Sequence, residues 1–247
     1  MPFVKLKYCD SIHYLDFGKG KTLVLLPSLW VTSKSYTMLG GELAEKYRVL
    51  IPDLYRGESK FRRTAKNIDD YVEQLYRFLE KLHITDCYLV GISASGATAT
   101  KFVLKYPDLV KKLFLISSSI ISFKTPSRKI ALFWGYLKLF FHNFYSLKGI
   151  ATNLTWAKDG LLSGLCHPKQ AIMEGLITTT LENEEIKALP IPTKLLFAKS
   201  DEFIPLEVIN KMQNISNLQL EILDEHHAWF FGREGVLARK IFSFFTN

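Results

Sequence analysis

Short apolar runs alternate with longer segments of helical apolar spacing along most of the chain. Strand-like patterns cover 3–8, 12–17, 22–26, 48–52, 87–92, 112–117, 194–198 and 218–223. Helical patterns cover 34–46, 67–82, 95–106, 205–212 and 228–245. The first two strands predict a hairpin. The other strands alternate with helices, so we predict an α/β fold whose mostly parallel sheet is covered by helices on both faces.

The alternation stops between residues 120 and 189, where the sequence is mostly helical and rich in aromatic residues. The longest apolar run there, 130–141, is shorter than the roughly 20 residues that a transmembrane helix needs. We therefore expect no transmembrane segment. Instead we predict a helical lid subdomain at 120–189, inserted after a central strand of a core that comprises 1–119 and 190–247.

Cysteine usage and the N-terminal sequence bear on the compartment. Cys9, Cys87 and Cys166 are too few and too far apart to suggest a disulfide framework or a Cys/His metal site. The first residues also lack the basic start and continuous apolar stretch of a signal peptide. We therefore expect a cytoplasmic protein that holds no metal.

The formal net charge of +8 favours encounters with acidic partners. The lysines are nevertheless spread along the chain, and the sequence contains no basic helix or nucleic-acid-binding motif. We therefore expect a generally basic surface and no nucleic-acid partner.

The stretch GISASG, residues 91–96, stands between a predicted strand and a predicted helix. It is similar to the G-x-S-x-G turn that carries a nucleophilic serine, except that Ser95 occupies the position of the second glycine. A strand-to-helix connection made of small residues explains this motif alone equally well. If the turn is a nucleophile turn, we expect Ser93 to be exposed and Ser95 to lie in the first helical turn, where it would cap the helix.

A nucleophilic serine needs a histidine base and usually an acid that orients the histidine. In an open α/β sheet such groups gather at the carboxyl ends of the strands. Asp201 follows the strand at 194–198, with Glu202 as a weaker alternative for the acid, and His226 and His227 follow the last strand. The order Ser–Asp–His along the chain is the order found in α/β-hydrolases.

Together these segments resemble the α/β-hydrolase fold superfamily, close to its small lid-bearing carboxylesterases. The matching stretches are LVLLPSLW, RVLIPDLYRGES, YLVGISASG, TKLLFAKSDEFIP and DEHHAWFF. The resemblance implies a catalytic triad of Ser93, Asp201 and His227. It also implies that the backbone amides of Leu29 and Ala94 form the oxyanion hole.

The chain departs from the family pattern at three places near this site. Pro27-Ser28 replaces a His-Gly pair, and Ser95 and His226 each replace a glycine. Because backbone amides form an oxyanion hole, the change at Pro27-Ser28 need not remove it. The added bulk of Ser95 and His226 either narrows the specificity or marks a degraded site.

The resemblance implies a serine carboxylesterase that forms an acyl-enzyme and needs no cofactor. We expect an apolar acyl pocket lined by Trp30, Phe133, Trp134, Phe140 and Phe141. Basic residues of the predicted lid would suit an acidic acyl carrier protein as partner; they are Arg128, Lys129 and Lys138. Family members include esterases that cleave pimeloyl-acyl-carrier-protein methyl esters in biotin synthesis. A non-hydrolytic acyltransferase and a catalytically silent ligand-binding relative are the alternatives, since a fold alone does not fix function.

Overall fold

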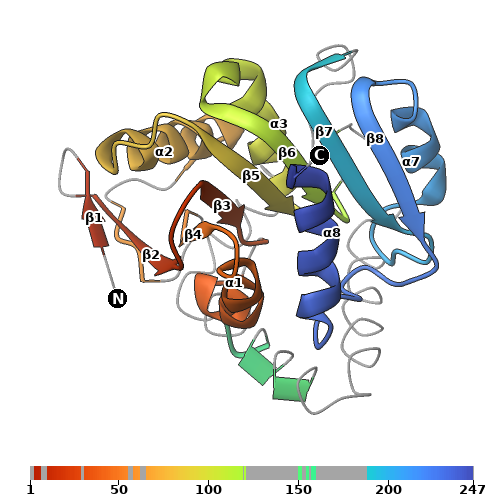
Figure 1. Cartoon of the computed structure of the whole chain (residues 1–247), viewed down its shortest axis with the longest axis horizontal. Coiled ribbons are helices and arrows are strands. Elements are labelled where there is room, and N and C mark those ends of the chain that lie inside the picture. The colour runs from red at the N-terminus through yellow and green to blue at the C-terminus, as the bar shows by residue number, and fades with distance from the viewer. Residues whose placement is uncertain are drawn as a thin grey trace.

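A single mixed sheet forms the centre of the molecule in the computed structural model (Figure 1). The structure describes residues 3–6, 10–28, 31–54, 58–61, 65–118, 120, 150–151, 154–155, 157–159 and 188–246. Within these residues the strands are β1 (Phe3–Lys5), β2 (Ser11–Phe17), β3 (Thr22–Leu26), β4 (Arg48–Pro52), β5 (Cys87–Ile92), β6 (Val110–Ile116), β7 (Ala188–Ala198) and β8 (Ser216–Leu223). Their order across the sheet is β1-β2-β4-β3-β5-β6-β7-β8. Only the pairs β1–β2 and β2–β4 are antiparallel, so the predicted mostly parallel sheet is confirmed.

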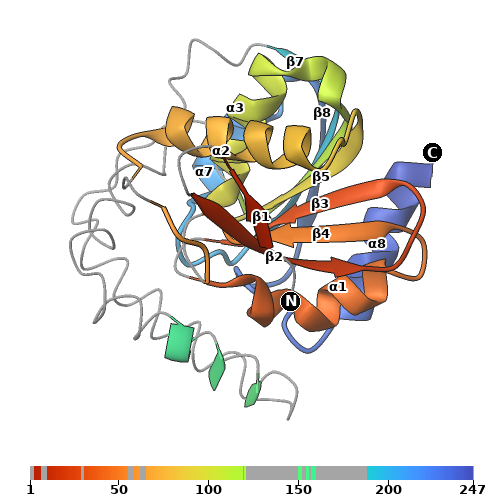
Figure 2. The same ribbon diagram turned by 90° about the vertical axis from the view of Figure 1, so that its left-hand side faces the viewer.

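Helices cover both faces of this sheet, as the sequence predicts (Figure 2). The α-helices are α1 (Thr37–Leu43), α2 (Ile68–Lys81), α3 (Ser95–Lys105), α7 (Leu206–Met212) and α8 (Glu234–Thr246), and the 3-10 helices are η2 (Ser33–Tyr36) and η3 (Pro107–Leu109). Helices α2, α3 and α7 share one apolar core, and α1 and α8 share the other. Successive residues of a strand point to opposite faces, so Leu89 enters the first core and Val90 the second.

The predicted helix at 67–82 illustrates how well local signals mark an element. Asn67 is its N-cap, and the side-chain oxygen accepts a hydrogen bond of 3.0 Å from the amide of Asp70. Asp69 and Asp70 lie in the first turn, where negative charge favours the helix dipole. The apolar side chains that recur at helical spacing are all buried on one face.

Two helices are shorter than the sequence predicts. The helix predicted at 34–46 is a 3-10 turn followed by α1, which ends at Leu43. The helix predicted at 228–245 begins only at Glu234. The four consecutive side chains of 228–231 are all buried, which a regular helix lying on one face of a sheet does not achieve. Gly232 follows them with a φ of 81°, a conformation that ends regular helical geometry.

Most of the predicted lid at 120–189 lies outside the described residues, so its boundaries stay a prediction. The same holds for the acyl-pocket and carrier-contact candidates Trp30, Phe133, Trp134, Phe140, Phe141, Arg128, Lys129 and Lys138, and for Leu29. The described part of the stretch includes residues 157–159, and β7 begins at its end with Ala188. Among the helices that the structure describes, none has the length and apolar character required to cross a membrane.

Candidate active site

Ser93 occupies a sharp turn between β5 and α3. Its φ of 53° is a left-handed conformation that is uncommon for any residue with a side chain. The turn is held because the Ser93 amide donates to the carbonyl of Ile116 (2.8 Å) and the Gly96 amide donates to the carbonyl of Ser93 (3.0 Å). This is the backbone geometry of a nucleophile elbow, which presents a serine hydroxyl at the carboxyl end of the sheet.

The two glycines of the turn let α3 approach the sheet closely. A Cβ atom added at Gly91 would lie 3.0 Å from both the Cβ of Ala99 and the Cα of Gly96. One added at Gly96 would lie 2.3 Å from the Cβ and Oγ of Ser118. No side chain fits at that second position unless its neighbour moves, so the turn needs the small residues that the sequence provides.

Ser95 is fully buried and bonds the ends of two strands. Its Oγ accepts a hydrogen bond from the Ile92 amide (2.8 Å) and lies within donating distance of the carbonyl oxygens of Leu26 (2.8 Å) and Ile92 (2.9 Å). The expectation that Ser95 caps α3 is therefore wrong: Ala94 is the N-cap residue, and no side-chain hydrogen bond caps the helix. The hydroxyl instead satisfies backbone groups of β5 and β3.

A histidine and a carboxylate complete a hydrogen-bonded chain with Ser93. Nε2 of His227, which follows β8, lies 2.9 Å from Ser93 Oγ. Nδ1 of the same ring lies 2.7 Å from Oδ2 of Asp201, which follows β7. An ionised carboxylate only accepts hydrogen bonds, so we assign the ring proton to Nδ1 and leave Nε2 to accept from the serine hydroxyl. The structure thus brings together the three residues that the sequence singles out as a triad.

Of the two adjacent carboxylates, Asp201 contacts the imidazole and Glu202 contacts the backbone. Oδ1 of Asp201 also accepts from the amides of Phe203 and Ile204, both at 2.9 Å, which fixes the orientation of its other oxygen. Oε2 of Glu202 accepts from the amide of His227 (3.0 Å). The imidazole thus meets Asp201, and Glu202 holds the loop that carries it.

Two further residues steady the His227 loop. The ring of Phe203 packs edge-on against the imidazole, with 4.7 Å between the ring centroids. Ser117 donates from its hydroxyl to the carbonyl oxygen of His227 at 2.8 Å. The sequence predicts neither contact, although Ser117 directly follows β6, at a strand end where site residues are expected.

The candidate oxyanion site is partly described. Ala94 lies half-buried at the start of α3, where the first amides of a helix have no intrahelical acceptor and favour an anion. Leu29, the other predicted donor, lies outside the described residues. Beside it, the amide of Ser28 donates to Tyr36 Oη (3.3 Å), and the amide of Val31 donates to the carbonyl of Ser28 (3.3 Å). Burial raises the pKa of Tyr36, so this anchor is a neutral phenol.

The arrangement can activate a serine hydroxyl. A ring nitrogen in contact with the hydroxyl can remove its proton, and the buried Asp201 carboxylate stabilises the resulting positive charge on the ring. In the part of the chain that the structure describes, no three His, Cys, Asp or Glu side chains gather in a way that could hold a metal ion.

Comparison with known families gives one match to a large part of the chain. The model of the alpha/beta hydrolase fold family matches residues 21–155, which is more than half of the 247 residues. The matched segment begins just before β3 and extends to residue 155, so it includes the turn that carries Ser93.

Two curated relatives are similar to different extents of the chain. A 2-hydroxymuconate semialdehyde hydrolase from Pseudomonas sp. (strain CF600) is 26% identical over 208 residues, covering 76% of this chain and 72% of the relative. A pimeloyl-[acyl-carrier protein] methyl ester esterase from Shewanella woodyi is 35% identical over 110 residues, covering 44% of this chain and 41% of the relative. The more similar relative therefore matches less than half of the chain.

Solved structures match nearly the whole chain at low identity. An esterase from Exiguobacterium antarcticum superposes with a TM-score of 0.84 at 17% identity and covers 99% of each chain. A meta-cleavage product hydrolase from Pseudomonas fluorescens IP01 superposes with a TM-score of 0.81 at 19% identity, covering 100% of this chain and 97% of its own. At such identities the likeness establishes the fold.

Proposed function

The chain belongs to the alpha/beta hydrolase fold family, and on that premise we propose that it is a serine carboxylesterase. Ser93 is the nucleophile, His227 the base and Asp201 the acid that orients the base. The observation that carries the proposal is the continuous chain of hydrogen bonds from Ser93 Oγ through the imidazole to Asp201 Oδ2.

The reaction follows from the direction of these bonds. His227 Nε2 takes the proton of Ser93 as Oγ attacks the ester carbonyl carbon. The amides of Ala94 and Leu29 stabilise the oxyanion, and Asp201 supports the imidazolium. His227 then gives its proton to the departing alcohol, which leaves an acyl-enzyme on Ser93. Water, deprotonated by His227, then attacks the acyl carbon. The bond to Ser93 Oγ breaks, the carboxylic acid leaves, and His227 returns its proton to Oγ.

For the acyl group we propose an apolar pocket under a helical lid formed by residues 120–189. Its lining would be Trp30, Phe133, Trp134, Phe140 and Phe141. The aromatic-rich sequence of the stretch supports this substrate class, because sites for apolar ligands are lined mainly by apolar and aromatic side chains.

A carrier-bound ester is the more specific form of this proposal. The net charge of +8 and the similarity to a pimeloyl-[acyl-carrier protein] methyl ester esterase support an acidic acyl carrier protein as partner. Arg128, Lys129 and Lys138 would contact it. Reversing the charge with Arg128→Glu or Lys129→Glu should then reduce turnover of the carrier-bound methyl ester and leave turnover of a free p-nitrophenyl ester unchanged. Unchanged turnover of both substrates would exclude the carrier.

A second candidate activity is hydrolysis of an oxo-acid. The relatives that support it match more of the chain: 76% for the 2-hydroxymuconate semialdehyde hydrolase, and 89% for a Pseudomonas hydrolase named for 2-hydroxy-6-oxononadienedioate and 2-hydroxy-6-oxononatrienedioate. Measuring kcat/KM for 2-hydroxymuconate semialdehyde beside p-nitrophenyl esters separates the two activities. A higher value for the oxo-acid would replace the esterase proposal.

The direct test is turnover of p-nitrophenyl esters of increasing acyl length. Removing the Ser93 hydroxyl with Ser93→Ala should reduce turnover by about a thousandfold or more, because the nucleophile is lost. Thr100→Val is a matched control, since it removes another buried hydroxyl, which bonds the carbonyl oxygen of Gly96 within helix α3. Turnover that survives in Ser93→Ala would overturn the proposal.

A further inference from the structure

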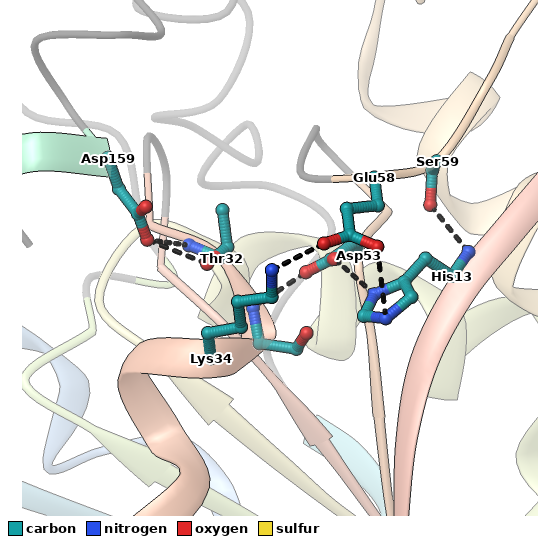
Figure 3. Close-up of polar contacts among 8 residues, drawn as sticks. His13, Thr32, Lys34, Asp53, Glu58, Ser59 and Asp159 are labelled. Atoms are coloured by element: carbon teal, nitrogen blue, oxygen red, sulfur yellow. Dashed lines mark hydrogen bonds and ion pairs between the residues drawn. The ribbon is translucent and has the colours of Figure 1, made fainter. Parts of the chain in front are cut away.

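A carboxylate from the stretch 120–189 binds the loop that follows β3. Asp159 Oδ2 accepts hydrogen bonds from the hydroxyl of Thr32 (2.6 Å), the amide of Thr32 (3.2 Å) and the hydroxyl of Ser35 (3.2 Å). Figure 3 shows Asp159 reaching Thr32 from its own segment, separate from the core elements. The contact joins residues 127 positions apart in sequence, so it fixes one segment against another rather than closing a local turn.

A second carboxylate binds the next amide from the core side. Oδ1 of Asp53, which follows β4, accepts from the amide of Ser33 at 2.6 Å. Its Oδ2 lies 2.7 Å from Nδ1 of His13 on β2, and both side chains are buried. Asp159 therefore binds the amide of Thr32, and Asp53 of the core binds the next amide, that of Ser33.

The core side of this loop is held by several contacts. The amide of His13 donates to Ser59 Oγ (2.8 Å), and His13 Nε2 lies 3.8 Å from Glu58 Oε2. Glu58 also pairs with Lys34, and that pair raises the pKa of Lys34 and lowers the pKa of Glu58 (Figure 3). Among the described residues, Asp159 is the one side-chain acceptor that the structure gives to the Thr32 amide.

The position of this loop matters for the proposed chemistry. Residues 27–32 follow β3, and the proposed oxyanion donor Leu29 lies between the anchored residues Ser28 and Thr32. An oxyanion donor is effective only when it is held in place before the charge develops, and errors of about 1 Å can cost about a hundredfold in rate. Asp159 fixes Thr32, only three residues after the proposed donor, so its loss should affect the reaction if Leu29 is that donor.

We propose that Asp159 is a positioning residue for the reaction. Its carboxylate fixes Thr32, which follows the proposed oxyanion donor Leu29 by three residues, and so holds this end of the connection after β3 for the reaction. The inference rests on the proposed serine esterase function and assigns to this segment a role in the chemical step, beyond covering the substrate.

Steady-state kinetics of Asp159→Ala and Thr32→Val test this role. Each variant should lower kcat by about tenfold to a hundredfold with little change in KM, because the loop acts on the transition state. The double variant should lose little more than Asp159→Ala alone, because the hydroxyl bond that Thr32→Val removes is one of the three bonds that Asp159→Ala removes. Asp159→Asn, which keeps an acceptor oxygen, should recover part of the rate. Asp16→Asn is the control, since it alters a surface carboxylate that bonds Arg48, the first residue of β4, whereas Asp53 follows the last residue of that strand.

Amide hydrogen exchange gives a readout that needs no substrate. In Asp159→Ala the Thr32 amide should exchange faster, while the Ser33 amide, bound to Asp53, stays protected. An active parent protein whose Asp159→Ala variant keeps its kcat would refute the positioning role and leave the esterase intact. A parent protein without ester turnover would refute the esterase function and, with it, the catalytic role of Asp159, whatever the exchange result.

Discussion

The hydroxyl of Ser95 lies 2.8 Å from the carbonyl oxygen of Leu26, which joins the turn that carries Ser93 to the strand end that precedes the proposed oxyanion loop. The usual residue at this position of a nucleophile turn is glycine, which has no side chain to make such a bond. Ser95 is completely buried, and its partners among the described residues are backbone groups. Ser95 thus adds a bond between the turn that carries Ser93 and the end of β3.

Removing this link should affect both stability and rate. Ser95→Ala leaves the buried amide of Ile92 without its acceptor, which costs about 1–3 kcal/mol of unfolding free energy. We also expect a lower kcat, because the turn loses its bond to the strand end that precedes the proposed oxyanion loop. Urea unfolding and ester kinetics measure the two effects. Thr100→Val should destabilise the protein without a loss of kcat, and equal kcat values for the two variants would contradict the linking role.

Replacing Asp201 or Glu202, the two adjacent carboxylates after β7, by its amide should have very different effects on kcat. Asp201→Asn should reduce kcat by about 10,000-fold, because the amide no longer favours the imidazole tautomer that accepts from the serine. Glu202→Gln keeps an acceptor oxygen for the His227 amide and should cost far less. Single-turnover rates on a p-nitrophenyl ester compare the variants. A larger loss in Glu202→Gln would show that the acid is misassigned.

The close approach of α3 to the sheet can be tested by a compensating pair of substitutions. Gly96→Ala places a methyl group 2.3 Å from Ser118 and should cost about 1–3 kcal/mol or more through overpacking. Ser118→Gly removes both of the atoms that would clash. The double variant should therefore be more stable in urea than Gly96→Ala, with Ser118→Gly alone as the reference. If it is not, the clash with Ser118 does not limit this position.

Cys87 should be chemically inert in the folded protein. Burial raises the pKa of its thiol from 9.0 to about 12, so the reactive thiolate is scarce at pH 8. A raised pKa means that folding favours the protonated thiol. Its contribution to stability is present below pH 9 and is lost as the pH rises toward 12. Iodoacetamide treatment followed by peptide mapping should modify Cys87 only after unfolding, and rapid modification of the native protein would disprove the assignment.

The sequence predicts the sheet better than it predicts the last helix. The strands 22–26, 48–52 and 87–92 have the predicted bounds because buried parallel strands appear as short apolar runs between turn residues. The apolar residues 228–231 give the same local signal whether they form a helix or a turn packed into the core. Only the tertiary structure separates these possibilities, and there the turn is formed.

The candidate site, too, could be predicted from the sequence only in part. Ser93, Asp201 and the histidine pair could be identified because each follows a predicted strand, and parallel strands bring their carboxyl ends to one edge. The partners of Ser95 and Asp159, which lie 69 and 127 positions away, could not, because no sequence motif marks either contact. Their geometry depends on how loops pack, for which a single sequence carries no periodic signal.

The most direct test of the central claim is the site of covalent modification by a fluorophosphonate, read by intact mass and peptide mapping. We expect one adduct per chain, located on Ser93 and absent from Ser93→Ala, because only this hydroxyl contacts the His227 ring in the described structure. An unmodified parent protein, or an adduct that maps to Ser95 or persists in Ser93→Ala, would contradict the assignment of Ser93 as the nucleophile.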